Sequence, residues 1–255
     1  MALRYAVANG NWSNTATWDG GTLPTSSDDV FANGFTVTIN GTFTVLTIRN
    51  TSNGSPVIAA GGQFIYANGG NLTCTASTGI IMGSLTSPLE MTLNRPDTAT
   101  FNGSILTVAN VGNYIVIRHS GTGTLNLNGN YNMDGTTTAR STISLSSIGT
   151  LNIVGNLSHN GSGGTFTNVI FIAPEATINI TGNITGPTSN GNLTSSTIYL
   201  IGGTVNIIGN TTANLGPAFY LPGAVNYNQI GNVSGSTQQP AIYNITAAST
   251  ITITG

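Results

Sequence analysis

Short runs in which apolar and polar residues alternate recur at regular intervals along most of the chain. Four runs share one phrase, in which Thr, an apolar residue, Asn and a second apolar residue lead to a closing Gly-Asn pair: Gly123–Asn130, Gly149–Asn156, Ala176–Asn183 and Gly203–Asn210. Their starts are 26, 27 and 27 residues apart, and looser copies follow at 223–232 and 249–255. A period of two puts Leu125 and Leu127 on one side of an extended strand and Asn126 on the other. The pattern predicts a β-strand at the same place in each repeat.

A second alternating run precedes each copy of the phrase. These runs are Tyr114–Arg118, Ser141–Leu145, Asn168–Ile172, Ser196–Ile201, Ala218–Leu221 and Ala241–Ile245. The segments between the runs are turns of Gly, Asn, Ser and Pro, and the apolar residues show no helical spacing. Each repeat therefore predicts two strands, with room for a third.

A repeat of this size cannot bury its apolar face alone, so the units must stack, each strand pairing with its counterpart one turn on. The predicted fold class is all-β: a single-stranded parallel β-helix (β-solenoid), right-handed by the general preference of such connections, with about nine coils from residue 35 onward. The Gly-Asn pairs suit the corners, because both residues tolerate left-handed backbone. Two columns of stacked side-chain amides are expected, formed by Asn126, Asn152, Asn179 and Asn206 and by Asn130, Asn156, Asn183 and Asn210.

The N-terminal segment differs from the rest of the chain. Residues 1–34 lack the repeat and contain both tryptophans, Trp12 and Trp18. The open end of a solenoid exposes its core and its strand edges, so a terminal unit must cover them. We expect a single domain with an N-terminal cap at 1–34 and a parallel β-helix at 35–255.

Charged residues are scarce. The chain has 5 basic residues, all Arg, against 7 acidic ones, and no Lys. So few positive charges cannot neutralise many phosphates or dock on an anionic membrane, and no apolar run is long enough to span a bilayer. We therefore expect neither nucleic acid nor membrane as a partner. Asn, Thr, Ser and Gly must form the surface instead.

The acidic residues give no paired site on a repeat of this length. They are Asp19, Asp28, Asp29, Glu90, Asp97, Asp134 and Glu175. Glycoside hydrolysis needs two carboxylates a few ångströms apart, but one repeat from Glu175 lies near Ile148 and one repeat from Asp134 near Gly161. The adjacent Asp28 and Asp29 are interpreted as turn residues that accept hydrogen bonds from nearby backbone amides.

The other residues with chemical potential also have structural interpretations. His119 and His159 are 40 residues apart, hence not one coil apart, and are expected at the surface. Cys74 has no partner for a disulfide and is expected in the core. The Gly-rich stretch 161–164 lacks a following helix and a Lys, so it is interpreted as a corner, and triplets such as Asn156-Leu-Ser158 arise from composition. We expect no catalytic residue, no cofactor and no metal site.

The opening of the chain carries a resemblance. Trp12 and Trp18 are followed by Gly20-Gly21, Pro24, Asp28-Asp29-Val30 and the alternating run Phe35–Ile39. Over roughly its first 40 residues, this order resembles the start of many β-helical proteins of tailed-phage virions and of bacterial surface adhesins. Phage proteins of this group are made in the host cytoplasm, whereas such adhesins usually carry an export signal. The first ten residues lack an apolar stretch of signal-peptide length, which favours the virion.

The resemblance implies a structural virion protein, such as a tail fibre, a head fibre or a capsid-decorating protein. Its expected location is the virion surface, and its expected partners are other capsid or tail proteins and host surface glycans. A polysaccharide-degrading β-helix enzyme is the first alternative. An extracellular adhesin or an ice-binding module is the second, prompted by the column Thr124, Thr150, Thr177, Thr204 and Thr250.

The last alternating run, Thr250–Thr254, suggests a further partner. A final coil with free strand edges and apolar alternation invites pairing with another chain. We expect it to be covered by a partner or by a second copy, as in a homotrimer.

Overall fold

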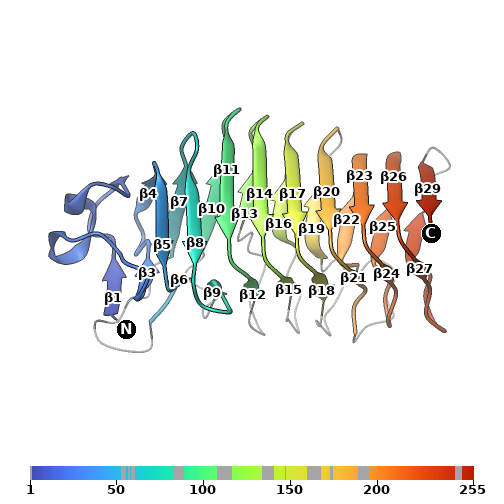
Figure 1. The fold of residues 1–255 in the computed structure, drawn as a ribbon, viewed down its shortest axis with the longest axis horizontal. Coiled ribbons are helices and arrows are strands. Elements are labelled where there is room, and N and C mark those ends of the chain that lie inside the picture. The colour runs from blue at the N-terminus through green and yellow to red at the C-terminus, as the bar shows by residue number, and fades with distance from the viewer. Residues whose placement is uncertain are drawn as a thin grey trace.

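The computed structural model is a straight rod with the N- and C-terminal segments at opposite ends (Figure 1). It describes residues 2–52, 56, 58, 61–82, 89–107, 117–133, 141–146, 148–159, 168–172, 175–188, 196–244 and 249–255. Across this part of the chain the regular structure is almost entirely β-strand, with two short 3-10 turns near the N-terminus, η1 (Thr15–Thr17) and η2 (Asp19–Gly21).

The strands form three sheets that run the length of the rod, with ten, ten and nine described strands. The first sheet contains β1 (Ala2–Tyr5), β3 (Asp28–Phe31), β6 (Thr47–Arg49), β9 (Ile80–Met82), β12 (Ile105–Thr107), β15 (Tyr131–Met133), β18 (Leu157–His159), β21 (Ile184–Thr185), β24 (Thr211–Thr212) and β27 (Val233–Ser234). The second sheet contains β2 (Gly10–Asn11), β4 (Thr36–Ile39), β7 (Gly62–Tyr66), β10 (Leu89–Leu93), β13 (Ile117–His119), β16 (Ser141–Leu145), β19 (Asn168–Ile172), β22 (Ile198–Leu200), β25 (Phe219–Leu221) and β28 (Ile242–Asn244). The third sheet contains β5 (Thr42–Val45), β8 (Asn71–Cys74), β11 (Thr98–Asn102), β14 (Thr124–Asn128), β17 (Thr150–Val154), β20 (Thr177–Thr181), β23 (Gly203–Ile208), β26 (Val225–Ile230) and β29 (Thr250–Thr254).

Each strand pairs with its counterpart one coil away, and the pairings between these strands are parallel. In the third sheet Leu125 of β14 lies opposite Leu151 of β17, which lies opposite Ile178 of β20 and then Val205 of β23. All four side chains are fully buried. The predicted fold class, a parallel β-helix, is confirmed, because equivalent apolar residues of successive repeats form one interior row.

The first sheet supplies the third strand of each coil. Its strands are only two to four residues long, and from β15 onward each of them follows the Gly-Asn corner that closes a strand of the third sheet. Such short strands carry one or two inward side chains, for example Leu157 in β18 and Ile184 in β21, both fully buried. A run this short shows too little alternation to be recognised from sequence alone.

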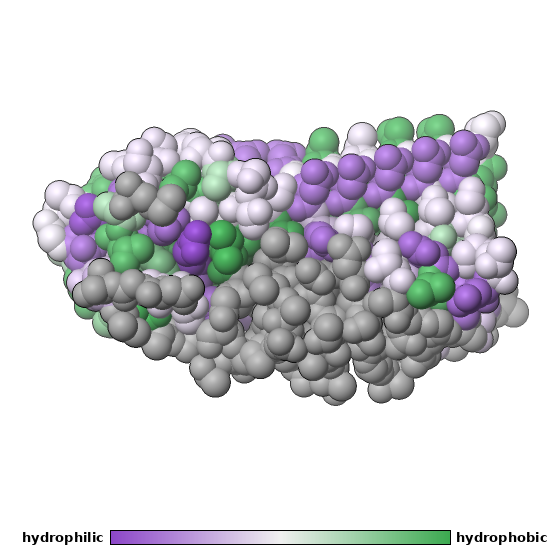
Figure 2. All heavy atoms as spheres, turned by 90° about the horizontal axis from the view of Figure 1, so that it is seen from below, coloured by the Kyte–Doolittle hydropathy of each residue, from purple (hydrophilic) through white to green (hydrophobic). Residues whose placement is uncertain are grey.

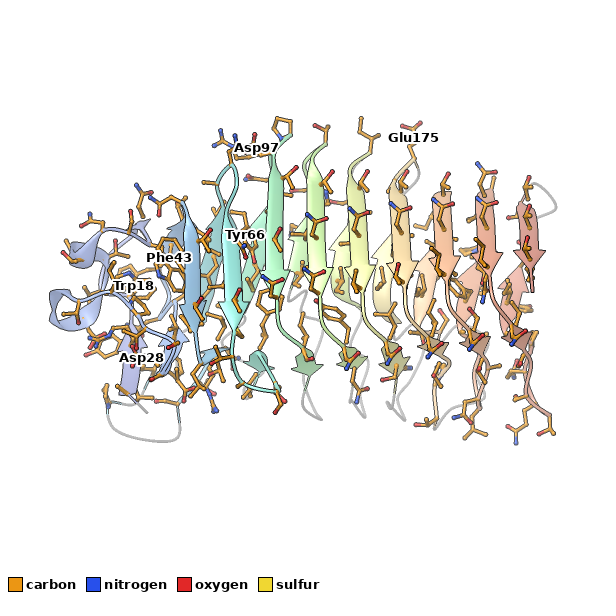
Figure 3. All side chains as sticks on the ribbon, in the orientation of Figure 1. Trp18, Asp28, Phe43, Tyr66, Asp97 and Glu175 are labelled. Carbon is orange, nitrogen blue, oxygen red and sulfur yellow. The ribbon has the colours of Figure 1, made fainter. Side chains whose placement is uncertain are left out.

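Residues 1–34 cover one end of the rod and also add strands to it. β1 pairs with β3, and β2 pairs with β4, so this segment extends the first and second sheets. Trp12 packs edge-on against Trp18, with ring centroids 4.9 Å apart, and its ring centroid lies 5.2 Å from that of Phe43 of the third sheet. Figure 3 shows Trp18 and Phe43 at this end of the rod. Both tryptophans are buried. The aromatic rings therefore cover the apolar interior at this end.

The corner between the third and first sheets is built on stacked glycines. Gly129 and Gly155 have φ of +156° and +150°, a backbone conformation that favours glycine. Their backbones also approach closely, because a Cβ added to Gly155 would lie 1.8 Å from the carbonyl oxygen of Gly129. The same contact recurs at the corners of later coils, at Gly182, Gly209 and Gly231. The corner requires glycine both for its conformation and for the space between coils.

Candidate binding groove

A ladder of side-chain amides runs along the outer face of the third sheet. It consists of Asn126, Asn152, Asn179, Asn206 and Asn228, one from each of five successive strands, β14 to β26. Each Nδ2 donates to the Oδ1 of the residue one coil before, at 2.9 Å, 2.8 Å, 2.8 Å and 3.0 Å along the series. The predicted amide ladder in this column is confirmed.

Two residues further along each strand, a second outward column lies beside the amide ladder. It contains Val154, Thr181, Ile208, Ile230 and Thr254, which we call the outer column. Val154, Ile208 and Ile230 are 55%, 58% and 61% exposed, so more than half of each aliphatic side chain faces solvent. Figure 2 views the rod from the side of the glycine corner, and hydrophobic side chains project along one edge of this view toward the C-terminal end.

A groove of about 430 Å³ lies between these two columns toward the C-terminal end of the rod. One wall is made by Asn179, Asn206, Asn228 and Thr252, and the other by Thr181, Ile208, Ile230 and Thr254. Three residues lie between the walls and turn buried side chains toward the core: Ile180, Ile207 and Gln229. The backbone of these residues forms the floor of the groove. The groove crosses β20, β23, β26 and β29 and is parallel to the rod axis.

The chemistry of the groove is uncharged and two-sided. None of the residues that line it carries an ionisable side chain. A side-chain amide has two N–H donors and an oxygen with two lone pairs, and the ladder uses one donor and one acceptor of Asn179 and Asn206. Each amide keeps a second donor and a second acceptor for a ligand, opposite the wall on which Ile208 and Ile230 expose aliphatic side chains.

The corner asparagines form a different kind of ladder from the one predicted. The Oδ1 of Asn130, Asn156 and Asn183 accepts the backbone N–H of the corner Asn one coil later, at 2.9 Å, 2.9 Å and 3.0 Å. The expectation of stacked amides is wrong here, because at a bend the backbone N–H turns outward from the sheet and needs an acceptor. The side chain satisfies it.

The threonine column lies in register but is interrupted. Thr124, Thr150, Thr177 and Thr204 are opposite one another in successive strands, and Thr98 of β11 extends the column at the other end. Asn226 then takes the position between Thr204 and Thr250. Five consecutive coils therefore present Thr beside the amide ladder.

Both histidines are buried, so the expectation that they lie at the surface is wrong. His119 of β13 is 0% exposed and its ring nitrogens lie 3.3 Å from the Leu93 carbonyl oxygen and 2.9 Å from that of Gly123. His159 of β18 is 1% exposed, and neither ring nitrogen has a hydrogen-bond partner in the described part of the chain. Burial lowers the pKa of His159 to about 4 and lowers that of His119 as well. The two residues belong to different sheets and form no joint site.

Asp28 and Asp29 begin strand β3 rather than a turn, and both are buried. The Asp28 carboxylate accepts the backbone N–H and the hydroxyl of Thr25 at 2.8 Å and 2.9 Å, as predicted for a residue that caps nearby backbone. Asp29 accepts the hydroxyl of Thr47 and pairs with Arg49 at 3.4 Å. The two carboxylates are therefore held by different neighbours.

Glu90 is the centre of a polar cluster on the outer face of the second sheet that sequence reasoning missed. Its Oε1 accepts from Arg118 Nε at 3.0 Å, from Gln63 Nε2 at 3.3 Å and from the Thr92 hydroxyl at 2.7 Å. Arg118 is in register with Thr92, 26 residues before it, so its contact with Glu90 spans 28 residues and runs diagonally between coils. The cluster holds a single carboxylate.

The remaining predicted residues are dispersed along the rod. Asp19 pairs with Arg4 at 3.4 Å, and Asp97 pairs with Arg95 at 3.0 Å. Glu175 is exposed on a turn away from Asp97 (Figure 3). Asp134 and the Gly-rich stretch 161–164 lie outside the described residues.

Cys74 is buried, as predicted, and burial raises the pKa of its thiol to about 12. The nearby Tyr66 and Tyr131 hydroxyls are also buried without a hydrogen-bond partner among the described residues, and burial raises the pKa of both. These groups stay protonated at neutral pH. Cys74, Tyr66 and Tyr131 are therefore residues of the core.

Comparison with protein families, curated proteins and solved structures gave no match to this chain. Within the described ranges, no three His, Cys, Asp or Glu side chains gather in a way that could hold a metal ion. The same ranges contain no helix long and apolar enough to cross a membrane. The role proposed for the groove therefore rests on its shape and its lining residues.

Proposed function

We propose that this chain is a structural, non-catalytic component of a tailed-phage virion surface, as a tail fibre, head fibre or capsid-decorating protein, and that its rod contacts neutral host glycans. The observation that carries the proposal is the uncharged groove between the amide ladder and the outer column. Neutral glycans present hydroxyl groups and C–H faces, which match amide groups and aliphatic side chains without any charged partner. The order of residues at the start of the chain supports the virion as the location.

The engagement of the carboxylates supports a non-catalytic role. Asp28, Asp29 and Glu90 each accept hydrogen bonds or pair with Arg. A glycosidase needs two carboxyl groups on either side of one bond, one of them free to give up or take a proton. The engaged carboxylates of the described residues do not offer this pair.

Immunogold labelling tests the location. Antibodies raised against the purified chain are applied to virions from the culture in which the protein is expressed, with pre-immune serum as the control. We expect gold particles on the capsid or tail of intact virions. Label restricted to cell envelopes or free protein would contradict the proposal.

A degradation assay tests the absence of catalysis. The chain is incubated with neutral and acidic capsule polysaccharides, and new reducing ends and unsaturated uronates are measured. We expect no release above a heat-denatured control. Release that is abolished by Asp134→Asn or Glu175→Gln would instead establish the depolymerase.

Ice binding is a second candidate because five consecutive coils present Thr98, Thr124, Thr150, Thr177 and Thr204 in register. A thermal-hysteresis measurement distinguishes it, since activity lost in a Thr150→Leu variant would favour this candidate. Pairing of the exposed strand β29 with another chain stays a prediction.

A further inference from the structure

We propose that the groove binds uncharged glycans that carry N-acetyl groups, with the sugar chain lying along the rod axis. The inference rests on the proposed contact with neutral glycans and specifies both the site and the substituent that it recognises. It follows from the two walls of the groove, which have different chemistry and face each other across four strands.

The polar wall is suited to an amide. Asn179 and Asn206 are held in place by the ladder, which accepts and donates one hydrogen bond at each side chain. Their orientation is therefore fixed before a ligand arrives, which lowers the entropy cost of binding. Each retains one N–H donor and one acceptor lone pair, and an acetamido group offers the complementary carbonyl and N–H.

The apolar wall is suited to a methyl group. Ile208 and Ile230 expose 58% and 61% of their surface, although most aliphatic side chains among the described residues are buried. A polymer whose only substituents are hydroxyl groups would offer this surface only the C–H faces of its rings and no methyl group. An acetamido group carries an amide and a methyl on one short substituent, so it can satisfy both walls at once.

The absence of ionisable groups on the lining determines the charge of the ligand. An acidic or amino sugar would lose hydration on entering the groove without gaining a counter-charge from its walls. This favours an N-acetylated sugar over its deacetylated, positively charged form. It also favours a neutral glycan over an acidic capsule polysaccharide.

The direction of the ligand follows from the repeat. Equivalent groups recur at every coil, with an inter-strand spacing of roughly 4.8 Å, so a chain lying along the groove meets similar groups at each step. The four strands of the groove span three such steps, about 14 Å. A short oligosaccharide can occupy it, and affinity should rise with length until the groove is filled.

Calorimetry with two matched sugar series tests the substituent. Oligomers of N-acetylglucosamine with two to six residues are compared with cello-oligosaccharides of equal length, which share the linkage but carry hydroxyl groups in place of acetamido groups. We expect the N-acetylated series to bind at least about tenfold more tightly, because one well-placed hydrogen-bonding group contributes about this much to affinity. Equal affinity for both series, or no binding of the N-acetylated one, would overturn the inference.

Three variants test the location, and the outer column itself supplies the substitutions. Thr181 and Thr254 occupy the same column as Ile208 and Ile230, so the double variant Ile208→Thr/Ile230→Thr introduces residues that the fold already accepts there. We expect it to weaken binding of the N-acetylated series about tenfold or more. Asn206→Thr also introduces a residue that the fold accepts in that column, because Thr252 occupies the column of the amide ladder. It should likewise weaken binding of the N-acetylated series.

Val154→Thr is the matched control. Val154 belongs to the outer column and is 55% exposed, but it lies outside the groove. We expect its binding to equal that of the unsubstituted chain, and circular dichroism spectra of all variants to coincide. Unchanged glycan binding in the double variant would overturn the site. A double variant that changes only the oligomeric state of the protein would also overturn it, because the groove would then be a contact between copies of the chain.

The outcomes separate this inference from the proposed function. Binding of other neutral glycans without preference for acetamido groups leaves the structural role intact and refutes only the ligand. Cleavage of the bound N-acetylated oligomer refutes the non-catalytic role and leaves the site intact.

Discussion

Replacing Gly155 with alanine should disrupt the corner between the third and first sheets. The residue has φ +150°, and an added Cβ would lie 1.8 Å from the Gly129 carbonyl oxygen of the coil before. Real Cβ atoms stay at least 3.0 Å from such an atom, so the two coils would have to separate by more than an ångström at this point. The backbone cannot absorb this change locally, because both atoms belong to hydrogen-bonded coils.

Two contributions set the size of the effect. Holding a non-glycine residue in this backbone region costs about 1–3 kcal/mol. Separation of the coils would also weaken the bond from Gly129 N–H to the Val154 carbonyl, now 2.9 Å, and that from Tyr131 N–H to the Asn156 carbonyl, now 2.8 Å, each worth roughly 1 kcal/mol. Together they predict a loss of about 3–5 kcal/mol in the free energy of unfolding.

A second variant has a conformational cost without the close contact. Gly69 also has positive φ, +69°, but a Cβ added there meets no atom within 4 Å. Gly69→Ala should therefore cost only the conformational part, about 1–2 kcal/mol. Both variants are compared by urea unfolding followed with far-UV circular dichroism, and by hydrogen exchange at the corner, because a solenoid can open coil by coil.

The comparison has a clear refuting result. If Gly155→Ala and Gly69→Ala lose the same stability, close approach of successive coils contributes nothing, and the glycines are needed only for backbone conformation. Loss of exchange protection at 129–133 and 154–157 in Gly155→Ala, with no comparable loss at 66–72 in Gly69→Ala, would support the close-contact explanation.

Three further predictions concern the core, the amide ladder and the ion pairs. Burial lowers the pKa of His159 to about 4, whereas the pKa of histidine in an unfolded chain is about 6.5. As the pH falls, the unfolded state therefore binds a proton at a higher pH than the folded state does. The free energy of unfolding should decrease by about 3 kcal/mol between pH 6.5 and pH 4. Urea titrations at the two pH values should show that loss much reduced in His159→Leu, and an unchanged pH dependence would contradict it. Asn179→Ala removes hydrogen bonds to Asn152 and Asn206 and should cost about 1–2 kcal/mol in the same titration, whereas no loss would mean that the ladder does not stabilise the rod. Glu90→Gln should cost less than about 1 kcal/mol because its pair is partly exposed, and a larger loss that persists in concentrated salt would contradict this.

The repeat allowed much of the fold to be predicted. Because successive coils are related by a nearly constant step, positions 26 or 27 residues apart become neighbours, and Leu125, Leu151 and Ile178 could be placed in one interior row. The same step placed Asn126, Asn152 and their successors in an outward ladder. These relations depend only on spacing and on the alternation of faces along a strand.

Alternation also held a signal for the buried histidines. His119 follows Ile117 by two positions and His159 follows Leu157 by two, so each shares the inward face of its strand. The residue type alone gave no such indication, because histidine is only intermediate in its tendency to be buried. In a solenoid the parity of a position is the stronger guide, because every inward position of a short strand is closed by the coils on either side.

The sequence by itself determined the strand repeat, the interior row, the outward amides and the scarcity of charge. Only the tertiary structure decided that Glu90 meets Arg118 and that Ile208 and Ile230 stand opposite the amide ladder to form a groove. The physical reason is that spacing along the chain fixes which residues share a column and a face, whereas contacts between neighbouring columns of one sheet depend on side-chain rotamers and on the twist of that sheet. Whether two columns meet or leave a groove between them is therefore decided only once the side chains are placed.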